Sequence, residues 1–97
     1  MNNSEIAAIF RDISGLLEKK KENWFKIRAY RKAADSIEGL PLPVEQLIAE
    51  NRLREVPAVG EAIARKVVEL VNTGRLEFHE KLKRELLELD ELSTRVP

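Results

Sequence analysis

The sequence predicts an all-α fold, a compact bundle of four to five short helices. Apolar residues recur at spacings of three and four along most of the chain, which is the period of a helix with one buried face. No segment alternates apolar and polar residues as a half-buried strand does. The sharp connections lie at residues 39–43 and 72–74, and no linker or low-complexity tract divides the 97 residues. One helical domain is therefore expected.

The first helix is predicted from an N-cap at Ser4 to about Lys19. Its apolar stripe consists of Ile6, Ile9, Phe10, Ile13, Leu16 and Leu17. After a polar break at residues 20–23, a second helix is expected to continue until Gly39 ends it. Its predicted buried side consists of Phe25, Ala29, Tyr30, Ala33, Ala34 and Ile37. The alanines on this side indicate close helix packing.

A short third helix is predicted from Pro43 to about Asn51, because proline suits the first helical position. Its anchors are Val44, Leu47 and Ile48, and residues 52–55 add a last turn. A final amphipathic helix is expected to end near Asp90. Its apolar residues are Phe78, Leu82, Leu86, Leu87 and Leu89.

Residues 53–74 carry a pattern typical of a helix-hairpin-helix, a motif that binds DNA phosphates. Pro57 disfavours a helical conformation at Val56, and Gly60 lets the backbone turn before the next helix begins. That helix stops at Thr73-Gly74, and its predicted core face consists of Ile63, Val67, Leu70 and Val71. The amide groups at its start, together with the helix dipole, form an anion site. Proline and glycine are also ordinary turn residues, so the alternative is a small helical protein-interaction domain whose hairpin only packs.

The charges are unevenly distributed although the net charge is zero, which alone argues against a nucleic-acid binder. Residues 19–32 hold seven basic residues and one acid, whereas residues 77–91 hold six acids and three bases. Arg28 and Arg31 suit bidentate phosphate contact, and Tyr30 can bury its ring while offering its hydroxyl to a phosphate. Trp24 is expected to close the core, with stacking on a base as the alternative.

Several function classes are excluded by composition. Cysteine is absent and His79 is the sole histidine, so neither a disulfide framework nor a zinc site is expected. No apolar run approaches the roughly 20 residues that span a bilayer, and the start of the chain lacks a basic, apolar leader. Asp12, Asp35 and Asp90 lie on separate helices, which excludes a two-metal polymerase site. A soluble, cytoplasmic monomer without membrane contact is expected.

Two blocks of the sequence resemble the amino-terminal domain of the DNA polymerase X family, whose member polymerase beta carries it as a lyase domain. They are residues 27–34 (IRAYRKAA), and Val56-Pro57-Ala58-Val59-Gly60 with residues 63–66 and 73–76. The opening residues 4–10 are similar to the bacterial and archaeal branch. Residues 1–91 are thus expected to form this domain. Residues 94–97 echo the hairpin lead-in at 54–57, and residues 92–97 are expected to begin a truncated second hairpin.

The resemblance implies a gap-filling repair polymerase whose domain binds 5′-phosphorylated gapped DNA without sequence specificity. The resemblance implies phosphate contacts by Lys26, Tyr30 and Arg54. The basic cluster adds Arg28 and Arg31 to the predicted phosphate-binding residues, and the hairpin adds Ala58, Val59 and Gly60. A monovalent cation, K⁺ or Na⁺, is implied on the backbone carbonyls of Arg54, Val56 and Val59. No other cofactor is expected in this segment, and the parent polymerase is expected to need a divalent metal.

Lys66 aligns with the lysine that in polymerase beta attacks the sugar of a 5′-deoxyribose phosphate, so it is the candidate catalytic residue. Partial burial and the neighbouring Arg65 are expected to favour its neutral amine, and the alternative is a lysine that only packs its stem. Ala62 and Phe78 stand where the eukaryotic pocket has basic residues, so slow or absent lyase activity is expected. Ala58 stands where the hairpin usually has glycine, which costs roughly 1 kcal/mol if φ is positive there.

Overall fold

The computed structural model describes the backbone of residues 1–95 and the side chains of residues 1–90. All regular structure in this part is helical, which confirms the predicted fold class. The elements are α1 (Asn3–Lys19), α2 (Trp24–Glu38), α3 (Val44–Ala49), the 3₁₀ turn η1 (Leu53–Glu55), α4 (Glu61–Thr73) and α5 (Glu77–Arg95). The prediction that the last helix ends near Asp90 was therefore wrong. Val96 and Pro97, which complete the expected second-hairpin sequence, lie outside the described residues.

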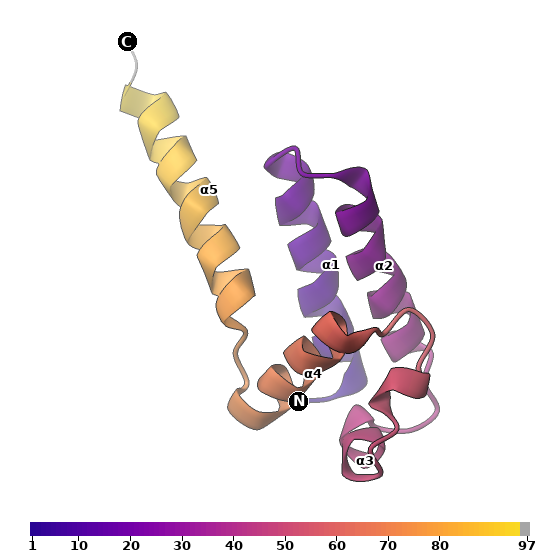
Figure 1. Ribbon diagram of the computed structural model, residues 1–97. Coiled ribbons are helices and arrows are strands. Elements are labelled where there is room, and N and C mark those ends of the chain that lie inside the picture. The colour runs from indigo at the N-terminus through magenta and orange to yellow at the C-terminus, as the bar shows by residue number, and fades with distance from the viewer. Residues whose placement is uncertain (96–97) are drawn as a thin grey trace.

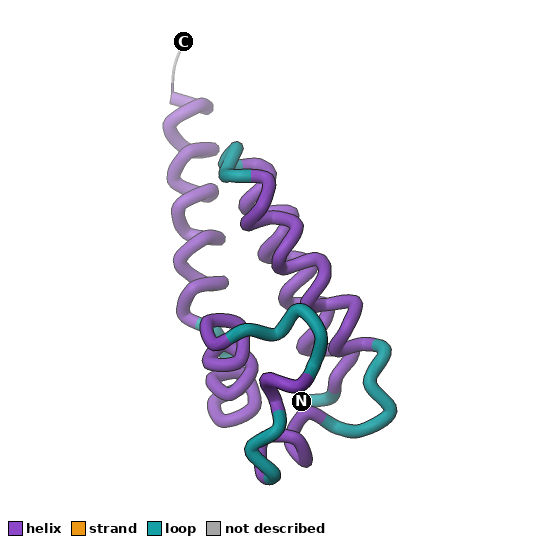
Figure 2. Tube along the Cα trace, turned by 45° about the vertical axis from the view of Figure 1, so that its right-hand side comes forward, coloured by secondary structure: helices purple, strands orange, loops and turns teal. Residues whose placement is uncertain are grey.

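The helices are arranged around an antiparallel pair formed by α1 and α2 (Figure 1). Helix α5 runs along the other side of α1 and diverges from it toward its C-terminal end, while α4, η1 and α3 lie toward the opposite end of the pair. In Figure 2, seen from another side, the C-terminal end of α5 reaches past the turn that joins α1 to α2. The radius of gyration is 14.8 Å, compared with about 12.5 Å for a compact domain of this length. The far end of α5 thus extends beyond the bundle.

Helix α1 begins with a capping box between Asn2 and Glu5. The Glu5 amide donates to the Asn2 side chain (2.8 Å), and the Asn2 amide donates to the Glu5 carboxylate (3.0 Å). The prediction of Ser4 as the N-cap was wrong, because this reciprocal pair satisfies two terminal amides and fixes the start of the helix two residues earlier. The predicted end at Lys19 is confirmed.

Helix α2 buries a face that differs in part from the predicted one. Its buried residues are Ile27, Tyr30, Ala33, Ala34 and Ile37. Phe25 and Ala29 are exposed instead, because at 100° per residue they lie opposite Ile27 and Ala34 on the helix. Trp24 was expected in the core but is 54% exposed. The N-terminal turn of α2 therefore presents two aromatic side chains to solvent.

Among the described side chains of α5, the buried ones lie in its first half. Leu82 is buried, as is Leu76 just before the helix, whereas Leu87 and Leu89 are exposed, contrary to the prediction. Two polar pairs connect α5 to α1, one between His79 and Asp12 and one between Lys20 and Glu85. No helix in the described part of the chain combines the length and apolar composition that crossing a bilayer requires.

Candidate nucleic-acid interface

The hairpin between η1 and α4 turns at Ala58. Val56 is extended, and its carbonyl accepts a hydrogen bond from the Val59 amide (3.1 Å). Ala58 has φ +67°, whereas Gly60 has φ −85° and serves as the N-cap of α4. The expectation that Gly60 supplies the turn was wrong, since the left-handed residue is the alanine at the position where the hairpin usually has glycine. Ala58 therefore carries a backbone strain of about 1 kcal/mol.

The start of α4 exposes a row of unpartnered amides. Within the described part of the chain, no group accepts a hydrogen bond from the amides of Gly60, Glu61, Ala62 or Ile63. Space is open around Gly60. The Glu61 carboxylate, which would compete for these donors, forms an ion pair with Arg65 (2.7 Å) one turn along the helix. The row of amides at the positive end of the helix dipole is suited to an anion.

The tip of the hairpin lies against the exposed face of α2. Ala58 lines a shallow depression together with Phe25, Arg28, Ala29 and Lys32. Phe25 is 80% exposed there. The structure thus brings Ala58 and Arg28, both predicted site residues, onto one surface with an aromatic side chain that the sequence analysis had placed in the core.

Three further predicted residues meet around the ring of Phe78. The ring centroid lies 5.1 Å from the Lys66 Nζ atom and 5.8 Å from the Lys26 Nζ atom. The Tyr30 ring stacks on Phe78 at 5.8 Å and in turn contacts Phe10. Tyr30 is 5% exposed, and burial raises the pKa of its hydroxyl. Lys26 and Lys66 therefore project from α2 and α4 to a common place on the first turn of α5.

Three features of its surroundings act on the pKa of Lys66. Burial lowers the pKa of Lys66, the nearby Lys26 ammonium lowers it further, and Glu69 opposes both. The predicted contribution of Arg65 is not found, because that side chain is 78% exposed and pairs with Glu61. The second cation of this site comes from α2, a helix about 40 residues away along the chain, and no local spacing could have identified it.

Arg31 and Arg54 lie apart from the lysine pair. Arg31 forms an ion pair with Glu18 (2.9 Å), and its guanidinium lies 5.3 Å from the Trp24 ring. Arg54 lines a depression between α3 and α4 whose floor includes Leu53 and Ala64. The carbonyls of Arg54 and Val59 accept no hydrogen bond from any described residue, whereas that of Val56 does.

Most of the predicted basic cluster is not neutralised by neighbouring acids. Five of its seven members form no ion pair with a described residue, namely Lys19, Lys21, Lys26, Arg28 and Lys32. The exceptions are Lys20 and Arg31. Zero net charge thus conceals an exposed cationic surface on α2 beside the hairpin.

The sequence analysis missed the part that two aromatic residues play at this surface. Phe25 was assigned to the core because it fits the apolar spacing of the second helix. Phe78 was predicted as an apolar residue of the last helix and as a position where a basic residue is absent, and its contact with two lysines depends on the tertiary arrangement of α2, α4 and α5.

Comparison with known proteins adds one finding. A family model described as a helix-hairpin-helix domain matches residues 1–76, which span α1 through α4 and include both the hairpin and the basic surface of α2. No curated protein matches the chain.

Proposed function

The chain belongs to the helix-hairpin-helix domain family, and from that premise we propose that it is the DNA-binding domain of a gap-filling repair polymerase of the X family. The domain, residues 1–91, binds the 5′-phosphate side of gapped DNA without sequence specificity. The carrying observation is that four amides without a described acceptor begin α4, the helix that also bears Lys66, one of two lysines at the Phe78 ring that form no ion pair with a described residue. Ala62 and Lys66 are four residues apart and therefore lie on one side of α4.

Contacts of this kind hold the DNA backbone without reading base edges. The backbone amides at the start of α4 donate hydrogen bonds to one phosphate, which the helix dipole also attracts. Lys26, Arg28 and Lys32 form ionic contacts with other phosphates. Phe25, exposed beside Arg28 and Lys32, offers a face on which an unpaired base in the gap stacks, an interaction that tolerates any base.

Binding to a gapped duplex at two salt concentrations tests this proposal. If three or four phosphates are neutralised, the affinity falls roughly 40- to 150-fold between 50 and 200 mM salt, because bound counterions are released. A duplex with a 5′-phosphate at the gap binds more tightly than one with a 5′-hydroxyl. Affinity that is independent of salt and of the 5′-phosphate would contradict the proposal.

We further propose that Lys66 supports a slow 5′-deoxyribose-phosphate lyase reaction. The neutral amine attacks C1′ of the open-chain sugar, water leaves as the imine forms, and loss of a C2′ proton breaks the C3′–O bond to leave a 5′-phosphate on the downstream strand. The lowered pKa of Lys66 supports the first step. Ala62 and Phe78 provide no cation to hold the substrate phosphate, so the reaction is slow.

Borohydride trapping tests the lyase proposal. Reduction of the imine links the domain covalently to a 5′-deoxyribose-phosphate DNA. The adduct is expected in the unmutated domain and lost in Lys66→Ala, with Lys83→Ala, which removes an exposed lysine of α5, as the control. An adduct undiminished in Lys66→Ala would reject the assignment, and the absence of any adduct would leave phosphate binding as the sole activity.

A monovalent cation at the hairpin is part of the proposal. The carbonyls of Arg54 and Val59 fit this role because they accept no hydrogen bond from the described residues, while the Val56 carbonyl already accepts one. A bound K⁺ or Na⁺ supplies positive charge beside the phosphate. Replacing K⁺ and Na⁺ by tetramethylammonium at constant ionic strength is expected to weaken DNA binding, and unchanged affinity would exclude the cation.

A further inference from the structure

Two lysine side chains that repel each other share a single aromatic ring. The Nζ atoms of Lys66 and Lys26 lie 5.1 and 5.8 Å from the Phe78 centroid, within the range of about 6 Å over which a ring attracts a cation. Their proximity is itself unfavourable, since the Lys26 charge lowers the pKa of Lys66. A third group must therefore hold the two ammonium groups near each other.

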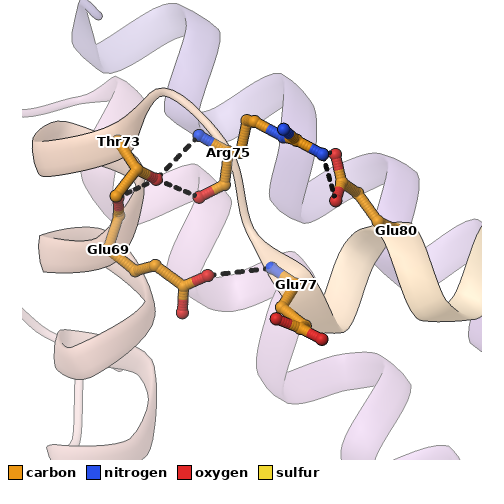
Figure 3. A network of polar contacts seen from close by, with 5 residues as sticks. All are labelled: Glu69, Thr73, Arg75, Glu77 and Glu80. Atoms are coloured by element: carbon orange, nitrogen blue, oxygen red, sulfur yellow. Dashed lines mark hydrogen bonds and ion pairs between the residues drawn. The ribbon is translucent and has the colours of Figure 1, made fainter.

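No acid in the described part of the chain holds the two ammonium groups near each other. Neither lysine forms an ion pair there, and Glu69, the acid that acts on Lys66, directs a carboxylate oxygen to the Glu77 amide at 2.8 Å (Figure 3). The electron-rich ring face of Phe78 is thus the shared attractive group for both ammonium groups. Two cations held together without a counter-anion are arranged to receive one.

Phe78 is well fixed for such a role. One side of its ring stacks on the buried Tyr30 at an interplanar angle of 18°. The backbone just before it is held by the hydrogen bond from the Glu77 amide to the Glu69 carboxylate, 2.8 Å (Figure 3). The position of the ring is therefore set by α2, α4 and α5 together.

We propose that Phe78 is a positioning residue that holds Lys26 and the ammonium form of Lys66, in place of the neutral form that attacks a sugar, as a two-cation clamp for the phosphate monoester at a DNA 5′ end. This inference rests on the proposed function, which it deepens by assigning recognition of the terminal phosphate to three named side chains. A terminal monoester carries more negative charge than an internal diester, so two converging ammonium groups favour it. Holding both lysines beforehand reduces the side-chain entropy lost on binding.

The test compares Phe78→Leu, which keeps an apolar side chain, with Phe78→Tyr, which keeps the ring. Two quantities are measured: the ratio of affinities for 5′-phosphorylated and 5′-hydroxyl gapped duplexes, and the NMR shifts of the lysine ε-methylene protons in the free protein. We expect the ratio to fall about two- to fivefold for each released lysine in Phe78→Leu. The ring-induced shifts of Lys26 and Lys66 disappear in the same variant. Both quantities persist in Phe78→Tyr.

The outcomes separate the inference from the function on which it rests. A ratio near one in the unmutated domain would reject the 5′-end function and the clamp together. A clear preference for the phosphate that is retained in a folded Phe78→Leu variant would reject the clamp alone. Absence of ring-induced shifts at both lysines in the unmutated protein would also reject it, because the ring would then not hold them.

Discussion

The two ends of α4 differ in which residue adopts a positive φ and in how the terminal backbone groups are hydrogen-bonded. Ala58 lies before the helix and has φ +67°, and Gly74 follows the helix and has φ +74°. At the C-terminal end the Gly74 amide donates to Leu70 (2.7 Å), and the Thr73 hydroxyl donates to the Glu69 carbonyl and accepts from the Arg75 amide. At the N-terminal end four amides have no acceptor among the described residues.

The difference indicates which end is built for stability and which for binding. At the C-terminal end, the closed end, glycine avoids backbone strain and the Thr73 side chain forms hydrogen bonds with the backbone. At the N-terminal end, the open end, alanine is strained and the terminal amide donors remain available to a ligand. Unsatisfied donors and backbone strain persist where they serve a function.

Removal of one cation from the proposed phosphate-binding surface and one from the closed end of α4 gives the largest expected difference. Lys26→Ala should weaken binding to gapped DNA about tenfold, because it removes a charged contact to phosphate. Arg75→Ala is the matched control, since it removes the same charge from the closed end. We expect its affinity to be unchanged, as measured by fluorescence anisotropy. Equal losses in both variants would mean that net charge, and no defined site, governs binding.

Gly74→Ala tests the closed end. Nothing lies within 4 Å of the added methyl group, so the cost is the left-handed backbone alone. We expect a loss of about 1 kcal/mol in the free energy of unfolding and a fall of roughly 5 °C in Tm. Thermal denaturation measures both. DNA affinity should stay the same, and a weaker affinity in the folded variant would contradict the separation of the two ends.

Ala58→Gly is the mirror-image change at the open end. The free energy of unfolding should rise by up to about 1 kcal/mol as strain at φ +67° is relieved. DNA binding should tighten a few-fold, because a methyl group leaves the approach to the hairpin amides. A stabilised variant with unchanged or weaker DNA affinity would show that the hairpin is not the phosphate site.

A smaller effect is expected on the titration of Lys66. Its pKa is lowered first by burial and then by Lys26. Lys26→Ala should therefore raise the pKa of Lys66 part of the way toward its ordinary value, and the amine should become neutral at a higher pH. Titration of ¹³C-labelled lysine ε-carbons measures this change. An unchanged pKa of Lys66 in this variant would show that the two side chains do not interact.

Much of the fold followed from sequence periodicity because helices are local structures. The hairpin lead-in at Pro57, the stop at Gly74 and the core face of α4 were all predicted from nearby residues, and the structure confirms them. The wrong assignments concern choices between two local solutions. Asn2 and Ser4 are both good caps, and Phe25 fits a helical stripe that tertiary packing did not use.

The candidate site was less predictable because it depends on three helices distant in sequence. Lys26, Tyr30 and Lys66 were proposed from a resemblance, and periodicity alone would have assigned Lys66 to the surface. The charge that acts on Lys66 was expected from Arg65 and comes from Lys26. The role of Phe78 depends on where the start of α5 packs relative to α2 and α4, which no local sequence pattern predicts.

The central claim is that the open end of α4 binds DNA phosphate and the closed end does not. Amide chemical-shift mapping during titration with a 5′-phosphorylated gapped duplex tests it most directly. The account predicts the largest shifts at residues 59–63 and 26–31, with little change at residues 73–76. Shifts confined to residues 84–90, with the hairpin amides unmoved, would contradict it and identify the chain as a protein-interaction domain whose hairpin only packs.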